Sequence, residues 1–457
     1  NNTNNFLSFF ATFAYSFKNR YVVNANVRND ASNVFGQDIN HRIDPTYSFG
    51  LSWRASEEAF FQKHLKWITT LNFRGTFGIQ GNALTRESPE LILSQQGVQP
   101  GYNRYFSTIG QIPNPYLSWE RTRNWNFGVD LELFRMFYMN LEYYTRRSNA
   151  VITVDLPFEY GIDDMKRNGG IIYNRGIEYT LSFTPIQKRD FSLNINLNAS
   201  KNWNKGGETK IDRNTAMYLR GGSTQILKEG YPLSAFWSYS FAGLDGSNGK
   251  PMFNYVEVPD EEKSKSIDPT TYLVYSGETE PYFTGGLGFS FRYKSLSLNT
   301  SFSLLLGSKK RLPSPYSDFQ GSGSMMPDPT KNVNRDLLNR WQKPGDEVYT
   351  NIPGLPTWPI EIGWTLPNTD SAESAIEMWE KSDAMVVSGS FLRCRNIGLS
   401  WQMKKEWCDK IHAKNLAINF NMDNIFVIAS KRFNGFDPEL ENSIMPRSFS
   451  LGLNIGF

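Results

Sequence analysis

The chain has 457 residues, and its 48 basic and 45 acidic residues are interleaved to a net charge of +3. This balance excludes the strong positive field of a nucleic-acid-binding protein. No run of 18 or more apolar residues occurs, which excludes a transmembrane helix. Aromatic residues make up 15% of the chain, which fits a large β core, a sugar-binding surface or the aromatic girdles of a membrane barrel.

The dominant pattern along the chain is an alternation of apolar and polar residues, which predicts β-strands. It begins at residues 7–17 and resumes at 21–28 after a tight turn. The same alternation then recurs at 47–54, 71–78, 124–133, 137–144, 177–183, 191–198, 287–293, 296–302, 397–401, 416–422 and 449–457. The sequence therefore predicts about 13 strands.

Three features favour a membrane barrel over a soluble secreted carbohydrate-binding β protein, which also alternates. The segments are about ten residues long, which is the length that crosses a bilayer at a tilt. Their polar faces are rich in Asn, Ser, Glu and Arg, as in a water-filled lumen. Short turns also alternate with very long loops, as expected when one side of the membrane carries the functional loops. We therefore predict an all-β, antiparallel transmembrane β-barrel.

The connections between the predicted strands fall into two groups. The short ones are 18–20, 55–66 (a short helical turn), 134–136, 185–190, 294–295 and 404–413, and the long ones are about 29–45, 80–120, 147–175, 204–282, 307–389 and 424–447. Bacterial barrels carry short turns in the periplasm and long loops outside the cell. Ser234–Ala242 would break this order as a spanning strand, so we assign it to the outer loop 204–282 as a small β-hairpin.

An odd strand number would place the two ends of the chain on opposite sides of the membrane, with Asn1 outside the cell and Phe457 in the periplasm. Bacterial single-chain barrels normally have an even number of strands. We therefore expect strands that are absent from this chain to complete the barrel. The start at Asn1–Asn5, without Met or a signal peptide, is interpreted as a cut end.

Four ordered stretches resemble the SusC/RagA-type TonB-dependent transporters of the Bacteroidetes outer membrane. They are Tyr21–Asn82 (with YVVNANVRNDASNVFG, FGLSWRASEEAF and FRGTFGIQGN), Asn114–Tyr179 (with NPYLSWERTRNWNFGVD and NRGIEY), Pro281–Tyr293 (PYFTGGLGFSFRY) and Gly389–Phe457 (with GSFLRCRNIGLSW, NMDNIF, GFDPE and NIGF). The resemblance spans nearly the whole chain. It is weakest in the loops 204–282 and 307–389, where substrate choice would lie.

The resemblance implies a barrel of about 22 strands around an N-terminal plug, with residues 1–457 as its C-terminal portion. It implies import of oligosaccharides or peptides across the outer membrane of a Gram-negative, Bacteroidetes-like cell, together with a SusD-like surface lipoprotein. TonB would act through the missing N-terminal region. Membrane lipid, lipopolysaccharide and the barrel-assembly machinery are the other expected partners. A SusC-family barrel that is a structural subunit of a larger assembly or secretion complex remains the alternative.

Two sets of residues are candidates for contacts with a transported solute. Exposed loop aromatics stack on sugars or pack against a partner, and the candidates are Trp237, Tyr239, Tyr316, Tyr349, Trp358 and Trp364. Charged lumen-facing side chains would line the path, and these are Arg54, Arg74, Glu132, Glu142 and Arg146. The alternatives are that the aromatics form the cores of the long loops and that the charges form an ion-pair lattice that braces the wall.

No enzymatic, cofactor or metal motif is convincing, so we expect neither catalysis nor a cofactor. Gly243–Lys250 (GLDGSNGK) is one residue longer than a phosphate-binding loop and is followed by a proline, so we interpret it as a turn. Asp245 and Asn248 are too few ligands for a Ca²⁺ loop. Cys394 lies in a predicted strand and Cys408 in the turn beyond its far end, so we expect two unpaired thiols.

The terminal strand alternates up to Phe457 and resembles the signal that the barrel-assembly machinery reads. The alternative is a residue that only faces the membrane. We predict that deletion of Phe457 sharply lowers the amount of assembled barrel in the outer membrane, because the signal is lost. Immunoblots of unheated outer-membrane fractions measure this amount, and an unchanged level would contradict the assignment.

Overall fold

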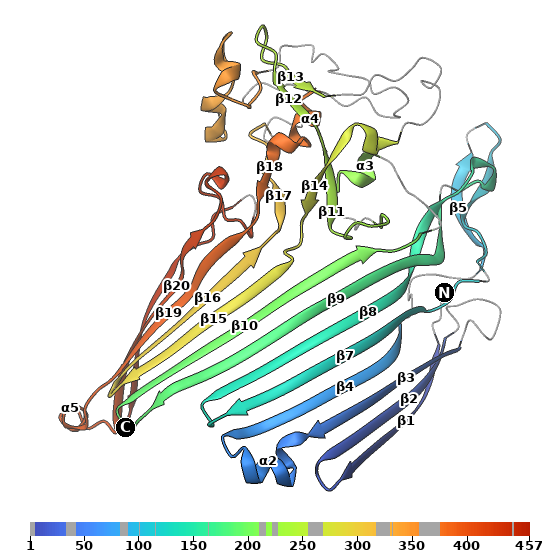
Figure 1. Ribbon diagram of the computed structural model, residues 1–457. Coiled ribbons are helices and arrows are strands. Elements are labelled where there is room, and N and C mark those ends of the chain that lie inside the picture. Colours follow the sequence, from blue (N-terminus) through green and yellow to red (C-terminus); the bar gives the residue numbers. More distant parts are fainter. Residues whose placement is uncertain are drawn as a thin grey trace.

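The structure is a computed structural model of the chain (Figure 1). It describes residues 5–32, 43–82, 90–99, 101–114, 116–162, 164–209, 216–221, 227–254, 268–316, 330, 332–355, 375–440 and 443–457. In these residues the helices are short and lie in the connections between strands. None of them is long and apolar enough to cross a membrane.

Thirteen antiparallel strands of the described residues form one sheet, and Figure 1 shows it as a curved wall of tilted strands. The strands follow chain order and are β1 (Phe6–Phe17), β2 (Tyr21–Ser32), β3 (Ile43–Arg54), β4 (Ile68–Asn82), β7 (Glu120–Leu133), β8 (Phe137–Asp155), β9 (Asp164–Gln187), β10 (Phe191–Gly206), β15 (Phe283–Tyr293), β16 (Leu296–Leu306), β19 (Phe391–Gln402), β20 (Asn415–Ile428) and β21 (Ser448–Gly456). The predicted antiparallel sheet is confirmed, including its number of strands.

One face of the wall is apolar, and its side chains are exposed at both edges and mostly half-buried in the central strands β10, β15 and β16. Phe9 of β1 is 67% exposed and Leu451 of β21 is 76% exposed. The strand register continues this face across the sheet, since Ala25 pairs with Phe49 in β3 and the next strands follow in the same phase. An apolar surface of this extent is unfavourable in water. It fits the hydrocarbon layer of a membrane, which a barrel wall contacts with one face.

The two ends of the wall carry different connections, as predicted. One end has tight turns and the short helices α2 (Ala59–His64) and α5 (Lys405–Asp409), which Figure 1 shows on the same side of the wall. Lys18 and Asn19 have positive φ angles of 52° and 56°, which is the backbone that a tight hairpin turn requires. The turn predicted at 185–190 is shorter than expected, because β9 runs on to Gln187.

The prediction of a long loop over residues 147–175 is wrong. β8 and β9 continue as paired strands as far as Asp155 and Asp164, and only a short connection joins them. The alternation ends before the strands do, because Thr145 and Arg147 occupy positions of β8 that continue its apolar face although neither residue is apolar. A bulge at Gly169 of β9 lies beyond this point.

Small strand pairs fill the predicted long loops beyond the other end of the wall. They are β5 (Ile92–Gln99) with β6 (Arg104–Gln111), β11 (Ala235–Tyr239) with β14 (Leu273–Glu278), β12 (Phe241–Leu244) with β13 (Pro251–Phe253), and β17 (Lys309–Arg311) with β18 (Val386–Ser388). The helices α3 (Ala216–Leu219) and α4 (Ala375–Glu380) lie among them (Figure 1). Ser234–Ala242 is outside the wall, as predicted. It is not a hairpin, however, because β11 pairs with the distant β14.

A buried ion-pair network fastens the last outer loop to β19. Arg393 Nη2 donates to both carboxylate oxygens of Asp437 at 2.7 Å, and the two side chains are only 2% and 5% exposed. Glu439 lies 2.9 Å from Arg393 Nε, without the angles of a hydrogen bond, and 2.8 Å from Arg395 Nη2. Between the two arginines, Cys394 is buried and free, which confirms its unpaired thiol.

We predict that Arg393→Met lowers the free energy of unfolding by about 3–5 kcal/mol, because Asp437 would stay buried without a partner. Arg395→Met is the matched control, since this side chain is 41% exposed and should cost less than about 1 kcal/mol. Urea unfolding in detergent, followed by tryptophan fluorescence, measures both losses. Equal losses would contradict the role assigned to the Arg393–Asp437 pair.

Candidate functional site

The polar face of the wall carries a lattice of ion pairs and amide hydrogen bonds. Arg74 Nη2 of β4 lies 3.2 Å from Asp130 Oδ1 of β7 and 2.9 Å from Glu142 Oε1 of β8. Asn140 donates to Asp130 at 2.7 Å, and Asn126 donates to Glu142 at 3.1 Å. These contacts join three neighbouring strands. The charges are satisfied within the wall, and they brace it.

The other charged residues predicted to face the lumen also lie on this polar face. Glu132 accepts a hydrogen bond from the Thr70 hydroxyl at 2.9 Å, and Arg146 Nε donates to Asn124 Oδ1 at 3.3 Å. Arg54 lies at the last position of β3, and its Nη1 donates to Oδ1 of Asn19 in the turn between β1 and β2. All five predicted residues therefore have a partner in the wall. This supports the bracing interpretation, while their role toward a solute stays a prediction.

Glycines face the longer polar side chains across the strand ladder. Gly128 lies opposite Arg74, and a Cβ added to this glycine would lie 3.1 Å from Arg74 Nη2. Gly286 lies opposite Asn198, where the corresponding distance to Oδ1 is 2.5 Å. The same arrangement occurs at Tyr144–Gly176, Asn421–Gly398 and Asn415–Gly456. Each glycine leaves the space that a long polar side chain occupies, and the sequence alone did not indicate these pairs because they depend on the register.

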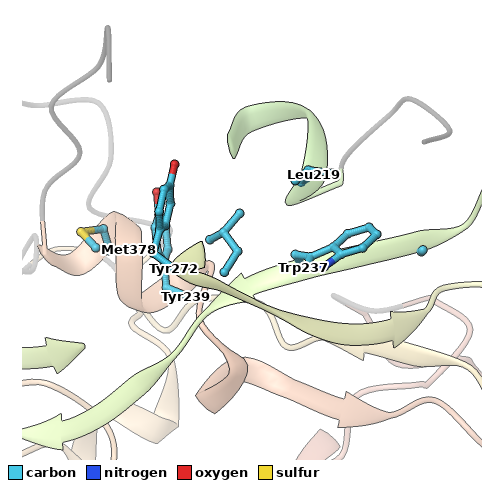
Figure 2. Close-up of a cluster of buried hydrophobic side chains, with 7 residues drawn as sticks. Leu219, Trp237, Tyr239, Tyr272 and Met378 are labelled. Carbon is cyan, nitrogen blue, oxygen red and sulfur yellow. The ribbon is translucent and has the colours of Figure 1, made fainter. Parts of the chain in front are cut away.

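The two candidate aromatic residues of the outer loop 204–282 are buried. Trp237 is 3% and Tyr239 is 2% exposed, and both belong to β11. They pack in a cluster with Leu219, Tyr272 and Met378, which Figure 2 shows gathered from separate elements around β11. Rings at this depth have no surface for a solute in this conformation. They form the core of the outer region.

Arg311 of β17 joins a second element to this core. Its Nη1 donates to the Arg220 carbonyl and its Nη2 to the Trp237 carbonyl, both at 2.6 Å. The guanidinium also lies 4.9 Å from the centre of the Phe236 ring. Burial, together with the charge of Arg220, lowers the pKa of Arg311 to about 10. The side chain therefore remains a cation at neutral pH and holds β17 against β11.

The candidate aromatic residues of the outer loop 307–389 lie in different environments. Tyr316 is fully buried in a cluster with Trp379, and its hydroxyl donates to the carbonyl of Pro353. Tyr349 is 89% exposed. The remaining two candidates, Trp358 and Trp364, lie outside the described residues. Of the four candidates that the structure describes, only Tyr349 offers an accessible ring.

The segment Gly243–Lys250 is a closed turn, as the sequence predicts. The Asp245 N–H donates to the Lys250 carbonyl at 2.8 Å, and Asp245 Oδ1 accepts from the hydroxyl and the N–H of Ser247. These hydrogen bonds hold the pKa of Asp245 below its ordinary value. The carboxylate is therefore used inside the turn. Within the described ranges, no group of three or more His, Cys, Asp or Glu side chains is placed to hold a metal.

Phe457 lies at the second edge of the sheet. Its side chain is 75% exposed, and its carbonyl accepts a hydrogen bond from Lys414 Nζ at 2.7 Å. Phe449, Leu451 and Leu453 precede it at alternate positions of β21 and are also exposed. This position fits a membrane-facing residue and an assembly signal equally well, so the signal stays a prediction.

The protein family described as "TonB dependent receptor-like, beta-barrel" has a model that matches residues 1–303, well over half of the chain. The chain belongs to this family. Among its curated relatives, TonB-dependent receptor SusC of Bacteroides thetaiotaomicron is 25% identical over 99% of this chain and 44% of the relative. TonB-dependent receptor P3 of Formosa agariphila is 23% identical over 100% of this chain and 46% of the relative.

The solved structure of the RagAB peptide transporter matches with a TM-score of 0.74 and 22% identity, over 99% of this chain and 48% of that chain. At this identity the match shows the fold of the TonB-dependent receptor barrel. The resemblance to SusC and RagA found in the sequence is confirmed. The chain spans about half the length of the relatives that it matches.

We predict that Trp237→Ala destabilises the outer region by about 3–5 kcal/mol, because it removes a large buried ring from the core. Tyr349→Ala is the matched control and should change stability by less than about 0.5 kcal/mol, since its ring is exposed. Amide hydrogen exchange of β11 and β14 reports the local stability. Equal exchange rates in the two variants would contradict the core assignment of Trp237.

Proposed function

We propose that this chain supplies much of the barrel wall and several outer loops of a SusC-like TonB-dependent transporter, which imports oligosaccharides or peptides across the outer membrane. The observation that carries the proposal is a 13-stranded wall with an apolar exposed face and a polar face, in a chain of the TonB-dependent receptor family. Such a wall separates lipid from a hydrated lumen. Its role is transport rather than catalysis, without a cofactor held by this part of the protein.

The two open edges of the sheet support a larger barrel. Among the described residues, β1 and β21 each pair on one side only, and every residue of β1 is exposed. Unpaired N–H and C=O groups are costly in hydrocarbon, so membrane sheets close. We propose that further strands of the whole transporter close the barrel at these edges. A plug with a TonB-binding segment would fill the lumen and couple energy to import.

A SusD-like surface lipoprotein is the proposed partner on the outer loops. The support is that three apolar side chains within residues 338–349 of that region are exposed, where Leu338 is 71%, Val348 is 77% and Tyr349 is 89% exposed. Exposed apolar side chains on one segment fit a protein contact. Lipid and lipopolysaccharide would surround the apolar face, and the barrel-assembly machinery would insert the wall through β21.

The proposal is tested by deletion of the gene and by purification of the intact protein from mildly solubilised membranes. We predict that the deletion abolishes uptake of one class of oligosaccharide or peptide, that the wild-type gene restores it, and that a surface lipoprotein copurifies. Uptake assays and mass spectrometry measure these results. Unchanged uptake, together with copurifying assembly or secretion components, would instead identify a structural subunit.

A further inference from the structure

A cavity of about 830 Å³ opens on the polar face of the wall, over β1, β2, β3 and β4. Small side chains form its floor, among them Ser48 of β3 and Thr76 of β4. Gly78 of β4 keeps the floor low, because a Cβ there would lie 3.2 Å from Ser48 Cβ. The longer side chains of Arg28 and Asp30 stand beside this floor. The volume is within the usual range for a small-molecule site, about 300–1,000 Å³.

The described residues that line the cavity carry no net charge. Among them, Arg28 and Asp30 are the charged ones, and Arg28 Nε contacts both carboxylate oxygens of Asp30 at 2.8 and 2.7 Å. Arg28 Nη2 also donates to the Ser8 hydroxyl at 3.2 Å. A charged solute therefore finds no unpaired opposite charge among the described lining residues. A neutral solute gains donors and acceptors on the floor and on the outer side of this ion pair.

The rest of the described lining combines hydroxyl and amide side chains with aromatic residues, which include Phe6 and Trp119. Asn26 donates to Ser48 Oγ at 3.1 Å, so these two groups are already oriented toward each other on neighbouring strands. Phe6 of β1 lines the cavity with 52% of its surface exposed. Sugar hydroxyls both donate and accept hydrogen bonds, and the C–H face of a sugar ring packs on an aromatic ring.

We propose that this cavity is a binding site for a short, uncharged oligosaccharide on the inner wall of the transporter. The inference rests on the proposed import function and adds a place and a chemical class for its solute. In this site the ion pair Arg28–Asp30 orients the sugar, the hydroxyls of Ser48 and Thr76 form hydrogen bonds with it, and the Phe6 ring stacks on it. The lattice around Arg74, whose charges are satisfied within the wall, plays no part in it.

The test uses the intact transporter, purified with its partners in detergent, and two matched variants. Thr76→Phe fills the cavity, while Thr180→Phe places the same ring on the polar face of β9, outside the cavity. The neutral probes are maltohexaose, xylohexaose and mannohexaose, the anionic probe is hexagalacturonate, and the peptide probe is hexa-alanine. Calorimetric titration measures their affinities, and the heat-modifiable band on gels confirms that each variant is folded.

We expect at least one neutral oligosaccharide to bind the wild type and Thr180→Phe alike, and to lose at least about tenfold in affinity in Thr76→Phe. Thr76→Val, which removes only a hydroxyl, should weaken it about three- to tenfold. Three results would overturn the site: no neutral probe binding the wild type, equal binding to both Phe variants, or only peptide or anionic probes depending on Thr76. Cellular uptake distinguishes failure of the proposed site from failure of the proposed import function. Unimpaired import by Thr76→Phe would contradict the site alone, whereas unchanged uptake after gene deletion would contradict the import function.

Discussion

Complete pairing of the strand backbones is the constraint on which the rest of this structure depends. A peptide group without a hydrogen-bond partner is expensive in hydrocarbon, so a wall in a membrane has to be a continuous ladder. The strands from β1 to β21 form such a ladder in chain order. Since successive side chains of a strand point to opposite faces, the ladder also decides which residues meet each environment. Phe9 and Leu451 belong to the apolar face, and Arg74 belongs to the polar one.

The polar face follows from the same ladder. Register places Arg74 beside Asp130 and Glu142, so that the charges neutralise one another across strands rather than facing the lumen alone. It also places Gly128 and Gly286 opposite long polar side chains, which leaves room for them to lie along the wall. Where small residues gather around Gly78 instead, the wall is hollowed. The size of the side chains at paired positions therefore decides where the polar face is raised and where it is hollowed.

The outer region obeys a different rule, because it stands beyond the strands of the wall. Water satisfies its loop backbones, and its stability has to come from apolar cores of its own. The described residues form two such cores, one around Trp237 and Tyr239 and one around Tyr316 and Trp379. Arg311 and the buried Arg393–Asp437 pair connect these outer elements to their neighbours. The contrast explains why aromatic residues of the wall face outward, whereas those of the two cores face inward.

The wall was predictable from the sequence because period-two alternation over about ten residues is a strong, local signal. The signal failed where polar residues continue the apolar face of a strand, as at Thr145 and Arg147 of β8. The ion pairs of Arg74 and the glycine pairs needed the register between strands, which alternation does not provide. Trp237 and Tyr349 are both aromatic residues of long loops, and the sequence around them does not distinguish a buried ring from an exposed one. Tertiary packing makes this distinction.

The central claim is that one face of the wall contacts lipid and the other contacts water. Single-cysteine variants at Leu298 and Asn299, neighbours on opposite faces of β16, test it most directly when each carries an environment-sensitive fluorophore in the intact protein in liposomes. The label at Leu298 should be quenched by spin-labelled lipid and shielded from iodide, and the label at Asn299 should show the reverse. Equal quenching of the two labels by iodide, with no effect of the lipid quencher, would contradict the assignment of this sheet as a membrane wall.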